Sequence, residues 1–362
     1  MSDIVLLLTS NGYAQEYERV VLNKNNYLTM DECYNIAENF KENFYGKGIS
    51  YHSAKSANVK TIPLYDINSK LIAYFLPTSN GEYTIVDARN NGYGVLETGN
   101  NIEKYEDKLK NSYGKQLFYI FPSMIFTSQE LHEYIDKHEI ENAEVLNLVK
   151  PTENSASLYR GSNEIVELSN ESEFVNIDGK YYGGNQSWFD EKSLQNTGCG
   201  TVASANIANH MSNYVRGCSK LYSYNSLSKS NFKKHMYDVE RYVTPTAIGV
   251  PSLRALESGF ERFADSRGID ISAYWSDQPA NRNTFTNYIK DGLRINSPVA
   301  YLQYFNSNQK EYDWHWMTIT KYFKNMSTGE QHIAVSTWGE RRSLNFNALL
   351  DGNLACGVLY FK

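Results

Sequence analysis

The hydrophobic and polar positions of the first 150 residues follow two different periods. Apolar residues recur at helical spacing in TMDECYNIAENFKENF, residues 29–44, and in TSQELHEYIDKH, residues 127–138. Each stretch opens with a capping-box spacing, Thr29 with Glu32 and Thr127 with Glu130. Between them LIAYFLPT, GEYTIVDAR and GYGVLETG, separated by Gly- and Asn-rich turns, predict a strand meander. We therefore expect residues 1–150 to form a small α+β domain.

Residues 151–179 interrupt this pattern. The stretch is polar, rich in Ser, Asn and Glu, and weakly periodic. Such a composition is typical of a linker or a loosely attached edge. We expect the boundary between two domains here.

From residue 180 onward, helical spacing comes first and strands follow. The predicted helix at 200–215 has an apolar stripe of Ala203, Ile207, Met211, Tyr214 and Val215. Further helices are predicted at 228–242, 252–267 and 282–295, and SPVAYLQYF, HWMTITKYF, QHIAVSTW, RSLNF and CGVLYF are predicted strands. Helices followed by an antiparallel sheet make an α+β domain over residues 180–362.

Charge and hydropathy limit the partners. The formal net charge is −6 without a basic stripe, so we expect no nucleic-acid partner, and the pairs Lys233–Lys234 and Arg341–Arg342 are expected on solvated faces. The run IVLLL at residues 4–8 is shorter than the roughly 7–15 residues of a secretory apolar region. No stretch approaches the ~20 apolar residues of a membrane span, so we expect no membrane partner. The sequence favours a cytoplasmic protein, or a secreted one whose leader has been removed.

The four cysteines are Cys33, Cys199, Cys218 and Cys356. They form no CxxC pair, so neither a zinc site nor any other metal or cofactor is expected. Cys33 falls on the apolar face of the first helix and is expected in the core. One reactive cysteine and three structural ones is the simplest interpretation.

Cys199 is the cysteine placed for chemistry. It opens the 200–215 helix, where free N–H groups and the helix dipole stabilise a thiolate. Gly198 and Gly200 flank it and would let the backbone turn tightly and a substrate approach. A buried structural cysteine at a tight turn is the alternative.

A nucleophilic cysteine needs a base, and His315 fits best among seven histidines. It starts an apolar strand between Trp314 and Trp316, which would exclude water from the ring. His332 is the second choice, with a structural role as its simpler interpretation, and His210 lies about three turns along the Cys199 helix, out of reach. An oxyanion also needs a side-chain donor, and Gln186 or Gln195, both upstream of Cys199, could supply an amide N–H.

Four elements follow one another in the order YGGNQSWF…TGCGTVASANI, INSPVAYL, HWMTI and VSTWG. In this order they resemble the papain-like cysteine peptidases, and within them the C39-like peptidase group, over residues from about 180 to 362. The resemblance implies a papain-like domain with Cys199 as nucleophile, His315 as general base and Gln186 as oxyanion donor, with Gln195 as a fallback. It also implies a peptide or protein substrate, with Gly198 and Trp314 near it.

The third catalytic position departs from the family. Where papain-like enzymes often have Asn in NSWG, this chain has STWG, which puts Ser336 at the Asn position. A serine hydroxyl can accept from the imidazole, but more weakly than a carboxylate. Ser336 is therefore the expected orienting group, with Asp313 or a bare Cys–His pair as alternatives. Aromatic residues expected around the cleft are Trp188, Phe189, Trp275 and Trp314.

The stretch PLYDINSKLIAYFLPTSNGEYTIVDARNNGYGVLETG resembles the pro-region of streptopain-type cysteine peptidases. The resemblance implies that the first domain covers the cleft of its own chain as an inhibitor. A tethered partner reaches about millimolar effective concentration, so weak docking would suffice. A permanent accessory domain is the alternative.

These observations predict a cysteine peptidase, and the pro-region resemblance adds the hypothesis that its first domain holds it inactive. The same chemistry could transfer the acyl group to an amine, as a transferase or ligase does. The other hypotheses are a non-catalytic binding protein on a papain-like scaffold and a surface module without enzyme activity.

Overall fold

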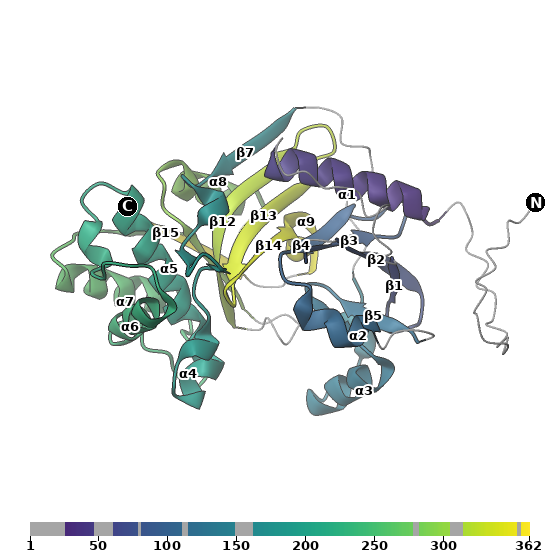
Figure 1. Cartoon of the computed structure of the whole chain (residues 1–362), viewed down its shortest axis with the longest axis horizontal. Coiled ribbons are helices and arrows are strands. Elements are labelled where there is room, and N and C mark those ends of the chain that lie inside the picture. Colours follow the sequence, from purple (N-terminus) through teal and green to yellow (C-terminus); the bar gives the residue numbers. More distant parts are fainter. Residues whose placement is uncertain are drawn as a thin grey trace, which may run out of the picture.

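The computed structural model describes residues 26–46, 61–78, 81–110, 115–148, 162–277, 282–304, 314–352 and 356–362. We call the described part up to residue 148 the N-terminal half and the part from residue 162 the C-terminal half. The helices are α1 (Met30–Tyr45), α2 (Glu106–Lys110), α3 (Ser128–Lys137), α4 (Lys192–Thr197), α5 (Cys199–Tyr214), α6 (Lys229–Glu240), α7 (Leu253–Ser266), α8 (Arg282–Arg294) and α9 (Phe346–Gly352). The expected α+β class is confirmed (Figure 1).

The strands of the N-terminal half are β1 (Ile62–Tyr65), β2 (Leu71–Pro77), β3 (Tyr83–Asp87), β4 (Val95–Gly99), β5 (Leu117–Ile120) and β6 (Met124–Phe126). Those of the C-terminal half are β7 (Asn163–Glu167), β8 (Asn176–Ile177), β9 (Tyr181–Tyr182), β10 (Ala273–Ser276), β11 (Val299–Gln303), β12 (His315–Asn325), β13 (Gln331–Thr337), β14 (Glu340–Asn345) and β15 (Cys356–Phe361). The predicted meander corresponds to β2, β3 and β4, and the five predicted late strands to β11–β15.

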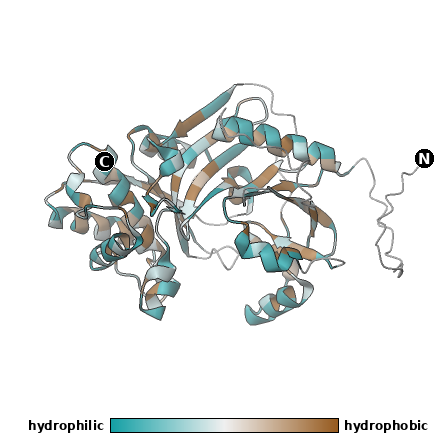
Figure 2. Cartoon of the chain, in the orientation of Figure 1, coloured by the Kyte–Doolittle hydropathy of each residue, from teal (hydrophilic) through white to brown (hydrophobic). Residues whose placement is uncertain are grey.

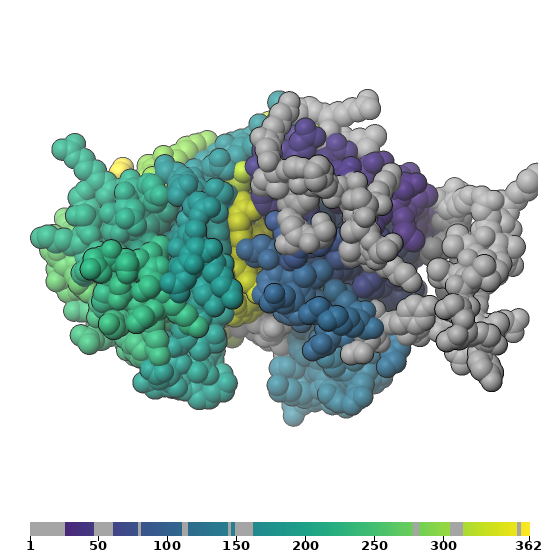
Figure 3. All heavy atoms as spheres, in the orientation of Figure 1, coloured from purple at the N-terminus to yellow at the C-terminus, as the bar shows by residue number. Residues whose placement is uncertain are grey.

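One large sheet crosses both halves. Its order is β10-β15-β11-β12-β13-β14-β4-β3-β2-β1-β5-β6, with β7 added beside β12, and β8 pairs separately with β9. The β1–β5 pair is parallel, and the other pairs described within this sheet are antiparallel. The halves meet where β14 pairs with β4, Arg342 opposite Gly99 and Leu344 opposite Glu97. In the space-filling view they lie side by side, and the yellow last part of the C-terminal half borders the N-terminal half (Figure 3).

Helix α1 crosses the junction between the halves. Its Phe40 and Phe44, both fully buried, pack on Phe323 of β12, and Phe40 also packs on the ring of His332 of β13. Cys33 on the same face is fully buried, as expected. The N-terminal half therefore shares a core with the strands of the C-terminal half.

The second part of the expected linker is ordered. Residues 163–167 form β7, which pairs with β12 and so matches the expected loosely attached edge. Glu171 is buried, and its carboxylate accepts hydrogen bonds from Nε and Nη2 of Arg341 at 2.9 and 2.8 Å. Residues 151–161 lie outside the described part, and the division into 1–150, 151–179 and 180–362 stays a prediction.

Local sequence signals place the helix starts correctly. Both capping boxes are present, at Thr29 with Glu32 and at Thr127 with Glu130. The four helices predicted after residue 199 correspond to α5, α6, α7 and α8. The outward faces of α1, α2 and α3 are mainly hydrophilic (Figure 2). In the described part of the chain, no helix is long and apolar enough to cross a membrane.

Helix α5 differs from its predicted single stripe. It is buried on all sides from Cys199 to Met211, whereas Tyr214 at its end is 42% exposed. A helix buried all round belongs in the centre of a domain, and α5 packs against β11, β12, α6 and α7. The first residue of α5 is thereby held next to the first residues of β12.

Candidate active site

Cys199 is the first residue of α5, as the sequence predicted. The glycines beside it are required by close packing within the chain. A Cβ on Gly198 would lie 2.5 Å from the Leu194 carbonyl oxygen, and one on Gly200 would lie 2.7 Å from Val250 Cγ2. These contacts fix the backbone on both sides of the sulfur.

Cys199, His315 and Gln186 line the same cavity. The cavity measures about 10 Å³, the volume that about one water molecule needs. Its other lining residues are Gly184, Val202, Ala203, Asn206, Trp316, Thr318, Ser336, Thr337 and Trp338. Two positions close in sequence, Gln186 and Cys199, and the distant start of β12 thus bring together the predicted oxyanion donor, nucleophile and base.

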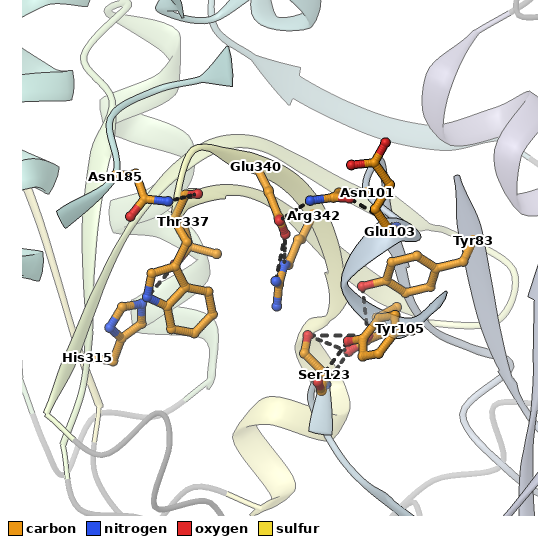
Figure 4. A network of polar contacts seen from close by, with 12 residues as sticks. Tyr83, Asn101, Glu103, Tyr105, Ser123, Asn185, His315, Thr337, Glu340 and Arg342 are labelled. Atoms are coloured by element: carbon orange, nitrogen blue, oxygen red, sulfur yellow. Dashed lines mark hydrogen bonds and ion pairs between the residues drawn. The ribbon is translucent and has the colours of Figure 1, made fainter. Parts of the chain in front are cut away.

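His315 is the first residue of β12 and is 6% exposed. A hydrogen bond of 2.8 Å joins its Nε2 to the Oγ1 of Thr337, at the end of β13 (Figure 4). Its ring stacks on Trp338, with centroids 4.5 Å apart and planes 20° apart. Burial, and then the positive charge of Arg342, lower the pKa of His315 to about 3. The imidazole is therefore neutral in this structure.

The predicted role of Ser336 is not the one that the structure gives it. Its hydroxyl donates to the Tyr182 carbonyl at 2.7 Å and accepts from Asn206 Nδ2 at 3.3 Å. Because its single proton is committed to Tyr182, Ser336 ties the 182–184 segment to β13, and its neighbour Thr337 makes the contact with His315. The alternative, Asp313, lies outside the described residues.

The Cys199 sulfur does not have the lowered pKa that a helix start alone predicts. Burial raises its pKa, and hydrogen bonds from the backbone N–H groups of Trp316, Gly200 and Cys199 lower it by less. The Cys199 thiol donates a hydrogen bond to the Trp314 carbonyl oxygen, 3.7 Å from Sγ. In this packing burial disfavours the thiolate, because none of the causes that act on Cys199 within the described part of the chain is a charged side chain.

The two glutamines have different positions. Gln186 lines the cavity, and its Nε2 donates to the Gln195 carbonyl at 2.8 Å. Gln195 donates its own amide to the Phe189 carbonyl at 2.8 Å. An amide nitrogen carries two protons, so Gln186 keeps a second donor, and Gln195 anchors it.

Other predicted residues lie elsewhere. His332 pairs with Glu330 at 2.7 Å beneath α1, and His210 contacts Asn296 at 3.3 Å. Of the aromatic residues expected around the cleft, Trp188 packs on Tyr181 and Phe232, Phe189 packs on Tyr237, and Trp275 donates to Glu257. Trp314 approaches the cavity through its carbonyl group.

Sequence reasoning missed Thr337, Asn206 and the arginine pair. Arg341 and Arg342 were expected on a solvated face, but their side chains are 11% and 2% exposed. Arg341 forms an ion pair with Glu171, which lies far away in sequence, and Arg342 forms one with Glu340. Only the prediction that RSLNF, which begins with Arg342, forms a strand could have hinted at this burial.

Comparisons with known proteins find no matching family model and no matching curated protein. Three solved structures are similar. A fragment of prointerpain A from Prevotella intermedia is 11% identical with a TM-score of 0.43, covering 83% of this chain and 97% of that chain. UfSP from C. elegans is 10% identical with a TM-score of 0.34, covering 70% and 52%. The avirulence protein AvrPphB from Pseudomonas is 12% identical with a TM-score of 0.24, covering 47% and 94%.

Proposed function

We propose that this chain is a cysteine peptidase with a papain-like catalytic arrangement. The observation that carries the proposal is the single cavity lined by Cys199, His315 and Gln186. A sulfur at a helix start, an imidazole and an amide donor are the three groups that thiol-based acyl transfer needs.

In the proposed reaction, His315 takes the thiol proton of Cys199 and the sulfur attacks a peptide carbonyl carbon. Thr337 holds Nε2, so Nδ1 is the nitrogen that exchanges protons with the thiol. The backbone N–H of Cys199 and the second amide proton of Gln186 donate to the oxyanion. His315 then protonates the leaving amine, and water releases the acyl group from sulfur, unless another amine takes it first.

We propose that the described packing is that of a latent form. A cavity of about 10 Å³ admits no peptide, and burial keeps both reacting groups uncharged. We propose that opening this region admits water and substrate, which restores the charged pair. The N-terminal half contributes no lining residue to the cavity among those described, so any inhibition by it acts through the shared sheet and core.

The test is the reaction of the full chain with iodoacetamide at neutral pH, followed by intact mass and peptide mapping. Wild type is compared with Cys199→Ala and His315→Ala, before and after limited proteolysis between the halves. Single-site labelling at Cys199 that His315→Ala slows supports the peptidase. Faster labelling after proteolysis identifies the N-terminal half as an inhibitor, and loss of the fold identifies it as an integral part.

The second possibility is a binding protein that does no chemistry. The uncharged states of Cys199 and His315 favour it, because a neutral buried pair needs no catalytic role. It predicts slow labelling of Cys199 that is unchanged in His315→Ala and after proteolysis. Hydrolysis of casein by the nicked chain, absent in Cys199→Ala, would exclude it.

A further inference from the structure

A column of side chains leads from His315 toward the N-terminal half. The imidazole stacks on Trp338, and the guanidinium carbon of Arg342 lies 5.0 Å from the centroid of a Trp338 ring. Glu340 Oε2 accepts from Arg342 Nε at 3.2 Å and Nη2 at 2.7 Å, and Glu340 Oε1 accepts from Asn101 Nδ2 at 2.8 Å (Figure 4). Asn101 belongs to the N-terminal half, so the column crosses the junction.

Trp338 is held at a backbone position that disfavours it. Trp338 and Gly339 form the two-residue turn between β13 and β14, with φ of 51° and 77°. Such turns favour Asn or Gly at these positions, and a bulky residue at positive φ is an outlier. Asn185 Nδ2 donates to the Trp338 carbonyl at 2.6 Å and fixes the turn. Strain of this kind marks a side chain that is kept for its contacts.

Arg342 is nearly fully buried, with 2% of its side chain exposed. Its backbone pairs with Gly99 of β4, next to the buried Glu97, whose pKa is raised by burial and lowered to a smaller extent by the Arg342 charge. Within the described residues, the cation that acts on His315 is Arg342, and the ionisable group sharing the cavity is the Cys199 thiol. Glu340 on the same strand and Glu97 on β4 are the nearby carboxylic groups that oppose the arginine charge.

We propose that Arg342 is a positioning residue for His315, acting through Trp338, and that the N-terminal half adjusts its effect through Asn101 and Glu340. This inference rests on the proposed Cys199–His315 pair. The arginine cation opposes protonation of the ring, and Glu340 weakens that opposition. The junction between the halves thereby sets how readily the imidazole takes the thiol proton.

The sign of each substitution follows from charge. Arg342→Met removes the opposing cation, so protonation of the ring and ionisation of Cys199 become easier at neutral pH. Glu340→Gln removes the carboxylate that bonds the Arg342 guanidinium, so the cation opposes protonation of the ring more strongly. Asn101→Ala changes no charge, but it removes the donor that holds Glu340 Oε1, so the carboxylate is fixed less well against Arg342 and a smaller change of the same sign as in Glu340→Gln is expected. If these side chains had only a structural role, all three substitutions would change the ionisation of Cys199 in the same direction.

The experiment measures the pH profile of Cys199 alkylation by iodoacetamide in the full chain, from pH 5 to 10. We expect Arg342→Met to raise the rate at pH 7 about tenfold, the ratio that one pKa unit represents. Glu340→Gln should lower that rate severalfold, and Arg342→Lys should restore a profile close to wild type. Arg341→Met is the matched control, a buried arginine on the same strand that Glu171 holds. It should reduce stability without moving the profile.

Shifts of the same sign for Arg342→Met and Glu340→Gln, or shifts no larger than that of Arg341→Met, would overturn the inference. If Arg342→Met does not fold, Glu340→Gln and Asn101→Ala decide it, since the Glu340 side chain is 18% exposed and glutamine keeps its size. His315→Ala separates the two proposals. An unchanged profile in His315→Ala refutes the Cys–His pair itself, whereas a changed one with no response to Arg342→Met refutes only the role of Arg342.

Discussion

Thr337→Val tests which residue orients the imidazole. Valine has nearly the shape of threonine but cannot bond Nε2 of His315, which Thr337 Oγ1 contacts at 2.8 Å. Losing a buried hydrogen bond and leaving one partner unpaired costs about 1 to 2 kcal/mol. With 1.36 kcal/mol per factor of ten, the population of correctly oriented rings should fall roughly 5- to 30-fold.

The assay is the second-order rate of Cys199 alkylation at pH 7, with urea unfolding measured in parallel. The rate should fall by that factor in Thr337→Val and recover in Thr337→Ser, which keeps the hydroxyl. Ser336→Ala is the matched neighbour. It leaves the Tyr182 carbonyl and the Asn206 amide without their partner, so it should lower the free energy of unfolding by about 1 to 3 kcal/mol and change the rate less than Thr337→Val does.

A wild-type rate in Thr337→Val together with a large loss in Ser336→Ala would refute this reasoning. It would mean that the family position, Ser336, orients the ring after the turn rearranges. Equal losses in both variants would indicate that the whole turn is required and that neither hydroxyl has a specific role.

Three further predictions concern stability. Glu171→Gln should lower the free energy of unfolding by about 3 to 5 kcal/mol, since it leaves the largely buried Arg341 without its counter-charge. Burial raises the pKa of Glu171, but Arg341 and hydrogen bonds lower it by more, so the stability of the wild type should decrease as the pH falls below about 4.3. Urea unfolding measured from pH 3 to 7 should show a weaker loss of stability in acid for the variant. Phe40→Ala should lower the free energy of unfolding by about 3 to 5 kcal/mol. It should also lower the midpoint of unfolding followed by tryptophan fluorescence, although all five tryptophans lie in the C-terminal half. An unshifted midpoint would mean that the two halves unfold separately. Gly183→Ala should lower both the stability and the Cys199 alkylation rate, because φ is 81° and a Cβ would lie 2.2 Å from Ser336 Oγ; wild-type values for both would contradict the tight contact.

Local patterns predicted the parts of the fold that depend on near neighbours. The capping boxes at Thr29 and Thr127 fixed the starts of α1 and α3, because their hydrogen bonds span only three residues. Short apolar stretches located β2–β4 and β11–β15, because such a stretch is also a local feature of the sequence. Pairing between β4 and β14 joins residues more than two hundred positions apart, and no short-range pattern carries that information.

The candidate site was predictable to the level of residue type and order. Cys199, His315 and Gln186 meet in one cavity, as the four ordered elements implied. The contact of Thr337 rather than Ser336 with the ring was not predicted, because the two are adjacent polar residues and the choice depends on contacts with Tyr182 and Asn206 that the sequence does not reveal. The catalytic roles of these residues stay predictions. Burial of the arginine pair was missed because Arg341 finds its carboxylate in Glu171, inside the expected linker.

Through Arg341 and Arg342, strand β14 contacts both the N-terminal half and the surroundings of the candidate site. Arg341 lies 4.5 Å from the Tyr45 ring centroid of α1 and bonds Glu171, whereas Arg342 lies against Trp338 beside His315. Neighbouring side chains of a strand point to opposite faces, so β14 contacts α1 on one side and, on the other, the Trp338 ring that stacks on His315. Its backbone also pairs with β4. A displacement of the N-terminal half would therefore move β14 and change the electrostatic environment of His315 without any contact between that half and the cavity.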